Sequence, residues 1–534
     1  MEKNKNIIIG FHSGHDCSYC ILENGVPIIH EELERITRLK EGNGDGLKLF
    51  LDRNPNLKDK SLTYSHCFHC NGKINIPSAV RSLGDEKLFD NMIENNDYHE
   101  VGHHLSHAAH AYYSSRFNNS LIISLDSGGW DINSENNPQI SSVAIYRGKN
   151  NKILSTALYP IHQLCVGPVW AESLEPLFGL SSGPPKGNQA GTIMAMAAIG
   201  KESAFEEIFY NSFLNIDNFK SYHPEIIEYI NQHEDNKYNV AKGIQKATES
   251  MIKEIIKMYI KPEDKTICFT GGVSLNSVCM GKISEWFPQI EEVFIPIVPY
   301  DGGLSIGSAQ YVYHHIQNNP KLSNDNYFKP YLGINYNKEV VNNAIEEFKD
   351  KIIISKKSDD EVIKLLSNNN IVSIFNGKSE SGRRALGNRS ILSDPRSNNM
   401  KDLINEKVKH RQWFRPFAPS ILKEEVSNWF EYEVDSPYMG VVVPFKKEKI
   451  NKVPAVVHLD GTGRLQTVSE DINKWYYNFL KLWYKESGVP ILLNTSFNDR
   501  EPIVETPTDA IKCYLGTNID YLYFPEHNIL INKR

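Results

Sequence analysis

The first forty residues alternate short apolar runs with polar, glycine-containing turns, a pattern typical of strands joined by tight loops. The predicted strands are residues 6–10, a run that ends at Leu22, and 26–30. Asn24-Gly25, between the last two runs, is a strong hairpin signal because both residues tolerate positive φ. Residues 31–40 then predict a helix.

Farther along the chain, apolar spacing changes from strand-like to helical and back again. Residues 120–125 predict a buried strand that ends in an Asp-Ser-Gly-Gly turn at 126–129. Residues 133–138 and 149–152 are rich in turn-forming residues. The predicted helices are 192–199, 202–213 and 240–260, followed by a strand at 266–269, a strand at 293–296 and a helix that begins near Tyr300 and ends at His315.

A polar stretch at 318–329 lacks periodicity and indicates a linker, so we place a domain boundary near residue 340. Beyond it, the sequence predicts a helix at 340–348, strands at 352–355 and 371–376, a helix at 359–367 and a buried strand at 490–493. Strands that alternate with helices predict an α/β and α+β protein. The expected domains are therefore 1–340 and 341–534.

A histidine-dense segment precedes the 120–125 strand. His103 and His107 are four residues apart, so on a helix they share one face, the spacing at which two imidazoles can bind one metal ion. Asp126 directly follows the strand and can supply a carboxylate. Two imidazoles and a carboxylate with open positions suit a divalent metal such as iron. The alternative is that, among the four histidines of the segment, one lies on the surface and three are packed: His103, His104, His107 and His110.

Three glycine turns follow strands in the first domain, and each exposes backbone N–H groups that can bind phosphate. The first lies near Gly14. The second contains Ser127 and Gly128, and the third contains Gly271, Gly272 and Asn276. A surface hairpin is the ordinary alternative for any one of them. Three such turns in this order indicate the nucleotide site of an actin-like domain.

Basic residues cluster in the second domain, although the whole chain carries a net charge of −7. Between Lys378 and Arg415 there are ten Lys or Arg residues and four Asp or Glu residues. These arginines are interleaved with Gly, Ala, Leu and Pro rather than with polar residues. Arginines held among packed residues bind phosphate or carboxylate as a fork. A solvated basic face is the alternative interpretation.

The overall charge gives no indication of a nucleic-acid surface, and no apolar run approaches the ~20 residues of a membrane span. We expect neither partner. The pairs Cys17/Cys20 and Cys67/Cys70 resemble zinc motifs, but the first pair lies in a predicted strand, where residues three apart face opposite sides. We therefore expect reduced, buried thiols in a cytoplasmic protein.

The order of the motifs GHDCS, HHLSH, DSGG, TGGVSLN, YDGG, RALGNRS, RPFAP, DGTGR and NTSFN resembles the O-carbamoyltransferases of antibiotic and nodulation-factor biosynthesis. The resemblance implies an actin-like (ASKHA) first domain similar to the metal-dependent protein that modifies tRNA with a threonylcarbamoyl group. It implies a YrdC-like second domain, similar to the synthase that makes threonylcarbamoyl-adenylate.

The resemblance also implies an activity. The second domain would make carbamoyl-adenylate from carbamoyl phosphate and ATP with Mg²⁺, and the first would transfer the carbamoyl group to a hydroxyl of a small-molecule acceptor. The implied metal ligands are His103, His107, Asp126 and Asp301, with Fe²⁺ as the expected ion. The implied carbamoyl-phosphate and ATP contacts are Arg384, Lys409, Arg415, Arg464, Asn494 and Ser496. His15 falls beside the transferred group, and His15, Lys409 and Arg415 are the expected catalytic residues. A homodimer is kept as a hypothesis.

Three positions depart from the family pattern: Arg383 replaces a proline, Gln412 replaces a glutamate, and Thr192 replaces a lysine, although Lys186 lies near it in sequence. These departures bear on substrate geometry rather than on reaction class. The alternatives are an actin-like small-molecule kinase, a fused tRNA-modifying enzyme and a non-catalytic nucleotide-binding regulator. Neither a kinase nor a regulator accounts for both the HxxxH spacing and the arginine cluster.

Overall fold

The chain divides into two compact units, each described here by itself. The computed structural model describes residues 6–42, 52–57, 62–67, 98–180, 189–322 and 328–534. The first unit comprises Met1–Thr37 and Glu41–Phe328, and the second comprises Arg38–Lys40 and Lys329–Arg534. The sequence placed the boundary near 340; the contacts divide the chain after Phe328.

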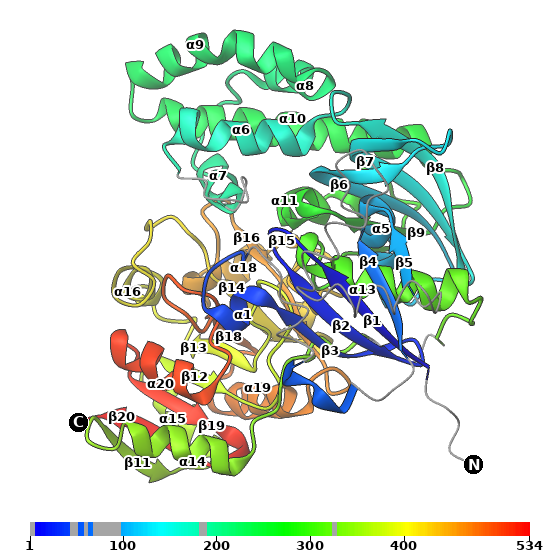
Figure 1. Ribbon diagram of the computed structural model, residues 1–534. Helices are drawn as coiled ribbons and strands as arrows, with labels where there is room; N and C mark the ends of the chain where they lie inside the picture. The colour runs from blue at the N-terminus through cyan, green and yellow to red at the C-terminus, as the bar shows by residue number, and fades with distance from the viewer. Residues whose placement is uncertain (1–5, 43–51, 58–61, 68–97, 181–188, 323–327) are drawn as a thin grey trace. The chain divides into compact units, whose positions relative to one another are not determined.

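The first unit opens with a five-stranded sheet in the order β3-β2-β1-β4-β5 (Figure 1). Its strands are β1 (Ile7–His12), β2 (Ser18–Glu23), β3 (Val26–Glu32), β4 (Thr63–Cys67) and β5 (Tyr98–Val101). The pairs β1–β2 and β2–β3 are antiparallel, whereas β1–β4 and β4–β5 are parallel. Asn24 and Gly25 have φ values of 51° and 84°, which confirms the predicted hairpin turn.

A second sheet repeats this topology in the order β10-β9-β6-β7-β8. Its strands are β6 (Asn119–Ile132), β7 (Pro138–Lys149), β8 (Lys152–Pro160), β9 (Thr266–Thr270) and β10 (Glu292–Phe294). As in the first sheet, one side is antiparallel, with the pairs β6–β7 and β7–β8, and the other side is parallel, with the pairs β6–β9 and β9–β10. This duplicated five-strand arrangement confirms the predicted actin-like fold.

Two helices pack between these sheets: α5 (His103–Ser114) lies on the second sheet and α13 (Leu304–Tyr311) on the first. The helices approach closely, because a Cβ on Gly307 would lie 1.8 Å from the carbonyl oxygen of Ser106. A short 3-10 turn, η3 (Asp301–Gly303), precedes α13. The close packing therefore brings the start of α13 beside the histidine face of α5.

Five helices form a separate layer of the first unit (Figure 1): α6 (Val166–Phe178), α7 (Ala190–Ala197), α8 (Glu206–Leu214), α9 (Ile216–Gln232) and α10 (Asn236–Tyr259). Helix α10 buries Val240, Ile244, Met251 and Ile255, the helical spacing that predicted it.

The other helical segments are α1 (Leu33–Thr37), η1 (Pro55–Leu57), η2 (Gly272–Leu275), α11 (Ser277–Gly281), α12 (Ile283–Trp286) and a π-helical turn, η4 (Val312–Ile316). None of the described helices is long and apolar enough to cross a membrane.

The second unit is built on an eight-stranded mixed sheet in the order β11-β20-β19-β12-β13-β18-β14-β17. The strands are β11 (Ile352–Lys356), β12 (Val372–Phe375), β13 (Arg389–Ser393), β14 (Ala418–Leu422), β17 (Gln466–Val468), β18 (Ile491–Ser496), β19 (Tyr521–Phe524) and β20 (Ile529–Lys533), with a separate pair, β15 (Val442–Pro444) and β16 (Thr462–Arg464). This is the mixed α/β unit that the resemblance predicts as YrdC-like.

Helices complete the second unit and cover its sheet. They are α14 (Lys338–Glu347), α15 (Asp359–Ser367), α16 (Met400–Lys407), α17 (Val426–Trp429), α18 (Lys447–Ile450), α19 (Lys474–Ser487) and α20 (Pro507–Gly516), with 3-10 turns η5 (Lys423–Glu425), η6 (Pro454–Val456) and η7 (Pro525–His527). Helix α15 spans the residues predicted for it and starts at a capping box of Ser358 and Glu361. Tyr476, Phe479 and Trp483 of α19 pack with Leu492 of β18 in a hydrophobic core of the second unit.

Two local predictions were wrong. The predicted helix at 31–40 shortens to α1, because Glu31 and Glu32 continue β3. The predicted turn at 126–129 does not end the strand: β6 continues to Ile132 and pairs with β7 on both sides of an irregularity between Leu125 and Gly129. The sequence also predicted neither β7 nor β8 as a strand.

Candidate metal centre and anion-binding cluster

The structure brings together four side chains that the sequence proposed as metal ligands. His103 and His107 lie on α5, Asp126 on β6 and Asp301 at the start of η3. Each offers a ligand atom that lies within 4.8 Å of the others, and all four residues are buried. His107 Nε2 is 3.4 Å from Asp126 Oδ2 and 3.3 Å from Asp301 Oδ1, and His103 Nε2 is 3.5 Å from Asp301 Oδ1.

A strand irregularity directs Asp126 into this cluster. Leu125 pairs with Val143 and Gly129 with Ser141, so three residues of β6 stand opposite one residue of β7. Such bulges redirect side chains and are frequent beside functional sites. The Asp126 carboxylate accepts hydrogen bonds from the backbone N–H of Ser127 at 2.5 Å and of Gly272 at 2.6 Å. The bulge and the third glycine turn together hold this carboxylate in place.

This arrangement changes how the predicted nucleotide-binding glycine turns are understood. The Ser127 and Gly272 amides, predicted to bind phosphate, donate to Asp126 instead. The Gly271 N–H donates to the Pro299 carbonyl at 2.7 Å. Asn276 accepts from the Cys279 N–H at 3.2 Å and donates to Gln245 at 2.9 Å, so it caps α11. Gly128 lies within the bulge with φ of 151°.

The four residues fit a divalent cation. The Nε2 atoms of His103 and His107 are buried and make no hydrogen bond to any residue that the structure describes. These nitrogens face the carboxylates at 3.3–3.5 Å without a hydrogen bond, and buried polar atoms in that state carry a desolvation cost. Lone pairs of two imidazoles and two carboxylates that converge on one point would be satisfied by a cation with mixed nitrogen and oxygen ligands.

The electrostatics of the cluster favour a cation as well. Burial and Asp301 oppose ionisation of Asp126, but His107 and His103 outweigh them and lower the pKa of Asp126 to about 2. Burial likewise opposes ionisation of Asp301, yet the surrounding histidines hold its pKa well below the ordinary value. Burial lowers the pKa of His103 to about 4. Burial would also lower the pKa of His107, but Asp126 and Asp301 raise it to about 9. The cluster therefore contains two ionised, buried carboxylates.

His15, the predicted proton acceptor, lies in the turn between β1 and β2. Its Nε2 is 3.4 Å from Asp301 Oδ2, and its Nδ1 is 3.4 Å from Asp16 Oδ2. Burial lowers the pKa of His15, but Asp301 and Asp16 raise it to about 9. Its side chain is 42% exposed, whereas those of the four clustered residues are at most 8% exposed. His15 is thus the member of this group that an incoming molecule can contact.

In the second unit, four arginines come together. Burial and then Arg384, Arg411 and Arg415 hold the pKa of Arg464 well below its ordinary value. Burial and Arg415 lower the pKa of Arg411 to about 9. Because a guanidinium stays protonated in proteins, these shifts indicate that the charges of these partly buried arginines are removed from water and repel one another. Arg464 Nε is buried without a hydrogen-bond partner among the described residues. This group is a candidate site for anions, and it is called the anion-binding cluster: Arg384, Arg411, Arg415 and Arg464.

Arg411 was not predicted from the sequence as a member of this cluster. Arg411 lies two residues after Lys409, donates to Asn405 Oδ1 at 2.8 Å and stacks 4.7 Å over the Phe417 ring. Its proximity to Lys409 was the available signal. These contacts fix its guanidinium beside Arg415 and Arg464.

The other predicted contacts of the second unit lie in two places. Asn494 is buried on β18, where its Nδ2 donates to Gln466 Oε1 at 2.8 Å while its Oδ1 has no partner among the described residues. Lys409 Nζ donates to the Ser496 carbonyl at 2.5 Å and to both the carbonyl and Oδ1 of Asn498 at 2.7 Å. The Lys409 ammonium therefore secures the NTSFN loop in this structure.

A buried glutamate shapes the RALGNRS loop. Glu380 accepts backbone hydrogen bonds from Leu386, Asn388 and Arg389. The Arg389 side chain donates to the carbonyls of Asn376 and Gly377 and stacks 3.6 Å over the Phe375 ring. Arg389 is thus a structural arginine, and the loop it stabilises carries Arg384.

The cysteine pairs show no zinc geometry within the described part of the chain. Cys17 and Cys20 are buried and free, and Cys67 is also buried and free. Cys70 of the second pair and Lys186 lie outside the described residues.

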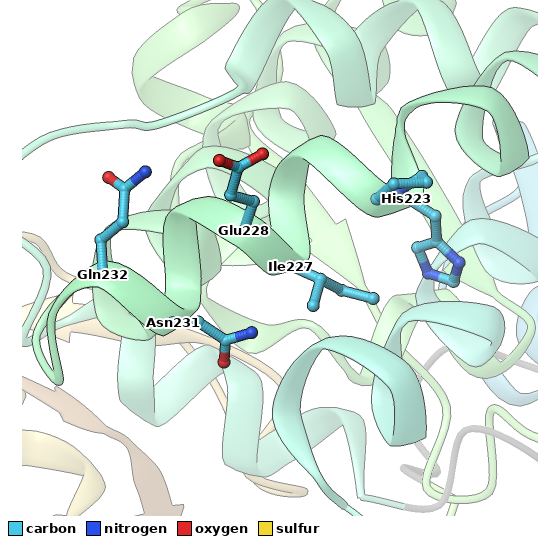
Figure 2. Close-up of a pocket in the computed structure, with 6 residues that line it drawn as sticks. His223, Ile227, Glu228, Asn231 and Gln232 are labelled. Carbon is cyan, nitrogen blue, oxygen red and sulfur yellow. The ribbon is translucent and has the colours of Figure 1, made fainter.

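A surface pocket of about 740 Å³ lies on α9, and none of the predicted site residues lines it (Figure 2). Its lining residues all come from one helix: His223, Pro224, Ile227, Glu228, Asn231 and Gln232. A pocket on one helix, without converging charged groups, lacks the features of a catalytic site.

Comparison with known proteins identifies relatives along most of the chain. A family model described as "Carbamoyltransferase N-terminus" matches residues 50–310, and one described as "Carbamoyltransferase C-terminus" matches residues 363–533. Nodulation protein NolO of Bradyrhizobium diazoefficiens is 31% identical over 79% of this chain and 77% of its own length. Nodulation protein NolNO of Sinorhizobium fredii is 31% identical, and the aligned region covers 81% of this chain and 64% of that relative.

Solved structures give weaker likenesses. HypF of T. kodakarensis aligns with a TM-score of 0.38 at 14% identity, over 59% of this chain and 48% of its own. A ROK family protein from Streptococcus pneumoniae aligns with a TM-score of 0.30 at 10% identity, over 58% of this chain and 99% of its own. At these TM-scores the likenesses add nothing to the sheet topology described above.

Proposed function

We propose that this chain, which belongs to the carbamoyltransferase family, is an ATP-dependent O-carbamoyltransferase that works in two steps. In the first step, the second unit converts carbamoyl phosphate, ATP and water to carbamoyl-adenylate, pyrophosphate and phosphate. In the second step, the first unit transfers the carbamoyl group to a hydroxyl of a small-molecule acceptor and releases AMP.

The anion-binding cluster supports the first step. ATP and carbamoyl phosphate together bring several negative charges to one place, and their mutual repulsion opposes reaction. Arg384, Arg411, Arg415 and Arg464 repel one another in the free protein, so anions that bind among them relieve that repulsion. Fixed guanidiniums also align the reactants and stabilise charge that develops in the transition state.

The first unit supports the second step. His103, His107, Asp126 and Asp301 would hold a divalent metal, with Fe²⁺ as the proposed ion. A bound metal would supply Lewis-acid polarisation of a carbonyl or of the acceptor oxygen. In its neutral form His15 would accept the proton of the acceptor hydroxyl as the hydroxyl oxygen bonds to the carbamoyl carbon. A cation held by Asp301 would favour that neutral form, because it would offset the carboxylate that raises the pKa of His15. The bond from that carbon to the adenylate oxygen breaks, and AMP leaves.

One observation carries this proposal: the first unit gathers negatively charged carboxylates, whereas the second gathers positively charged arginines. The first unit buries two ionised carboxylates among histidines, and the second gathers four partly buried arginines. A kinase requires only one phosphate-binding site for transfer from ATP to an acceptor. Two sites of opposite character fit an activation step followed by a separate transfer step.

The two half-reactions can be tested separately with Arg415→Ala and His103→Ala. Without acceptor, Arg415→Ala should lose pyrophosphate release dependent on carbamoyl phosphate by more than about tenfold. His103→Ala should retain that release but lose carbamoylation of a hydroxylated metabolite library, followed by mass spectrometry. The exposed residues Arg534 and His233 supply matched alanine controls. Equal loss of pyrophosphate release in both folded variants, or ADP as the nucleotide product, would refute the two-step proposal.

A further inference from the structure

The HHLSH motif contains a histidine that the metal cluster does not use. His104 is fully buried on α5, and its Nδ1 is 2.7 Å from Asp131 Oδ2. Its backbone N–H donates to Asp131 Oδ1 at 2.9 Å. One carboxylate therefore holds both the main chain and the side chain of the second residue of α5.

Asp131 replaces a local helix cap. Helix α5 starts after Gly102, which has no side chain to accept a hydrogen bond from the first turn. A Cβ on Gly102 would lie 2.6 Å from Asp131 Oδ1, so the glycine makes room for the carboxylate. The first turn of α5 is thus capped from β6, a different element.

This contact joins the two elements that carry three of the four clustered ligands. His103 and His107 flank His104 on α5, while Asp126 lies five residues before Asp131 on β6. Rotation or sliding of α5 against β6 would separate the two imidazoles from Asp126. A binding site of this kind needs its ligand atoms held within about 0.5 Å.

The chemistry of His104 identifies the atom that matters. A carboxylate hydrogen-bonded to Nδ1 keeps the proton on that nitrogen. The Nε2 of His104 is buried without a hydrogen-bond partner among the described residues and does not belong to the four-residue cluster. The Nδ1–H is therefore the group through which His104 acts.

We propose that His104 and Asp131 are positioning residues that set the metal affinity of the cluster by fixing α5 against β6. This inference rests on the proposed function, because it assumes that the cluster binds metal. It assigns a role to the second histidine of the motif and to a carboxylate that is not itself a ligand.

The test measures Co²⁺ binding to the full chain by its visible absorption, with chelator competition, and the melting temperature of the metal-free protein. Asparagine places its amide N–H near the position of the histidine Nδ1–H, whereas glutamine places it near Nε2. His104→Asn should therefore bind Co²⁺ within about threefold of wild type. His104→Gln and Asp131→Asn should bind it about 10- to 100-fold more weakly, the usual loss for partners behind metal ligands.

The matched control is Asp264→Asn. Asp264 accepts a charged hydrogen bond from Arg147 at 2.7 Å in the same unit, and it is not part of the cluster. This control should lower the melting temperature without changing Co²⁺ affinity, which would separate positioning from general stability.

Three results would overturn the inference. The first is wild-type affinity in both His104→Gln and Asp131→Asn. The second is retention of affinity by His104→Gln with loss in His104→Asn, which would make Nε2 the working atom. The third is a loss of affinity in Asp264→Asn as large as in Asp131→Asn. If wild-type protein itself binds no Co²⁺, the proposed metal site fails, an outcome distinct from these three.

Discussion

Gly129→Ala tests the metal cluster without touching a ligand. A Cβ at position 129 would lie 2.0 Å from Cγ of His103, 2.3 Å from Cδ2 and 2.4 Å from Nδ1. Ordinary carbon contacts begin near 3.4 Å, so the imidazole or the strand must move by about 1.4 Å. Misplacement of a working group by about 1 Å can cost about 10²-fold in rate. We expect a loss of that order in carbamoyl transfer, with weaker Co²⁺ binding.

The assay compares transfer with pyrophosphate release measured without acceptor. Release should be unchanged in Gly129→Ala, because the anion-binding cluster lies in the other unit. Gly516→Ala is the matched control: it ends α20, and a Cβ there has no heavy atom within 4 Å. Wild-type transfer together with wild-type Co²⁺ affinity in Gly129→Ala would show that the position of His103 does not matter, which contradicts the proposed site.

Three further outcomes are expected. His107→Ala should hold less than about a tenth of the wild-type metal by elemental analysis, since one of four ligands is lost; full occupancy would contradict the ligand set. Arg464→Lys keeps the charge but loses the planar fork, so its KM for carbamoyl phosphate should rise more than about tenfold, and an unchanged KM would count against a phosphate contact. Burial lowers the pKa of His314 to about 4. Because the unfolded residue titrates near 6.5, protons bind the unfolded state preferentially as pH falls from 6.5 towards 4, and the contribution of this group to stability is lost over that range. In urea unfolding, the stability advantage of wild type over His314→Asn should therefore shrink by about 2 kcal/mol between pH 7 and pH 5; an advantage independent of pH would contradict this.

The features that the sequence predicted well depend on local rules. His103 and His107 share a helix face because four residues make about one turn, and the strands, the hairpin at Asn24 and α15 follow from apolar spacing and turn chemistry. The actin-like fold was predicted from the glycine turns and the family resemblance, whereas β7 and β8 of the second sheet were not predicted. The structure places His103 and His107 beside Asp126 and Asp301, and the role of the two histidines as metal ligands stays a prediction.

The features that the sequence could not give depend on partners distant in the chain. The bulge at Asp126 exists only because β6 pairs with β7 on both sides of it. Strand β7 is itself hard to predict, since its apolar run is short and its ends are polar. The contact of Asp131 with His104 joins residues 27 apart, and no local pattern signals it. The burial of Arg411 likewise becomes visible only when Phe417 and Asn405 close around it.

The charged residues of the two units also favour the proposed order of the two steps, activation before transfer. The Ser127 and Gly272 amides, which could have bound phosphate, are occupied by the carboxylate of Asp126. The first unit thus offers less positive potential to a polyanion than the four arginines of the second unit do. Carbamoyl phosphate and ATP are highly charged, whereas carbamoyl-adenylate keeps a single phosphate. In the proposed mechanism, activation beside the four arginines would set the two polyanionic reactants against compensating charge. Transfer in the first unit would involve a less charged adenylate, with a bound cation offsetting the carboxylates there.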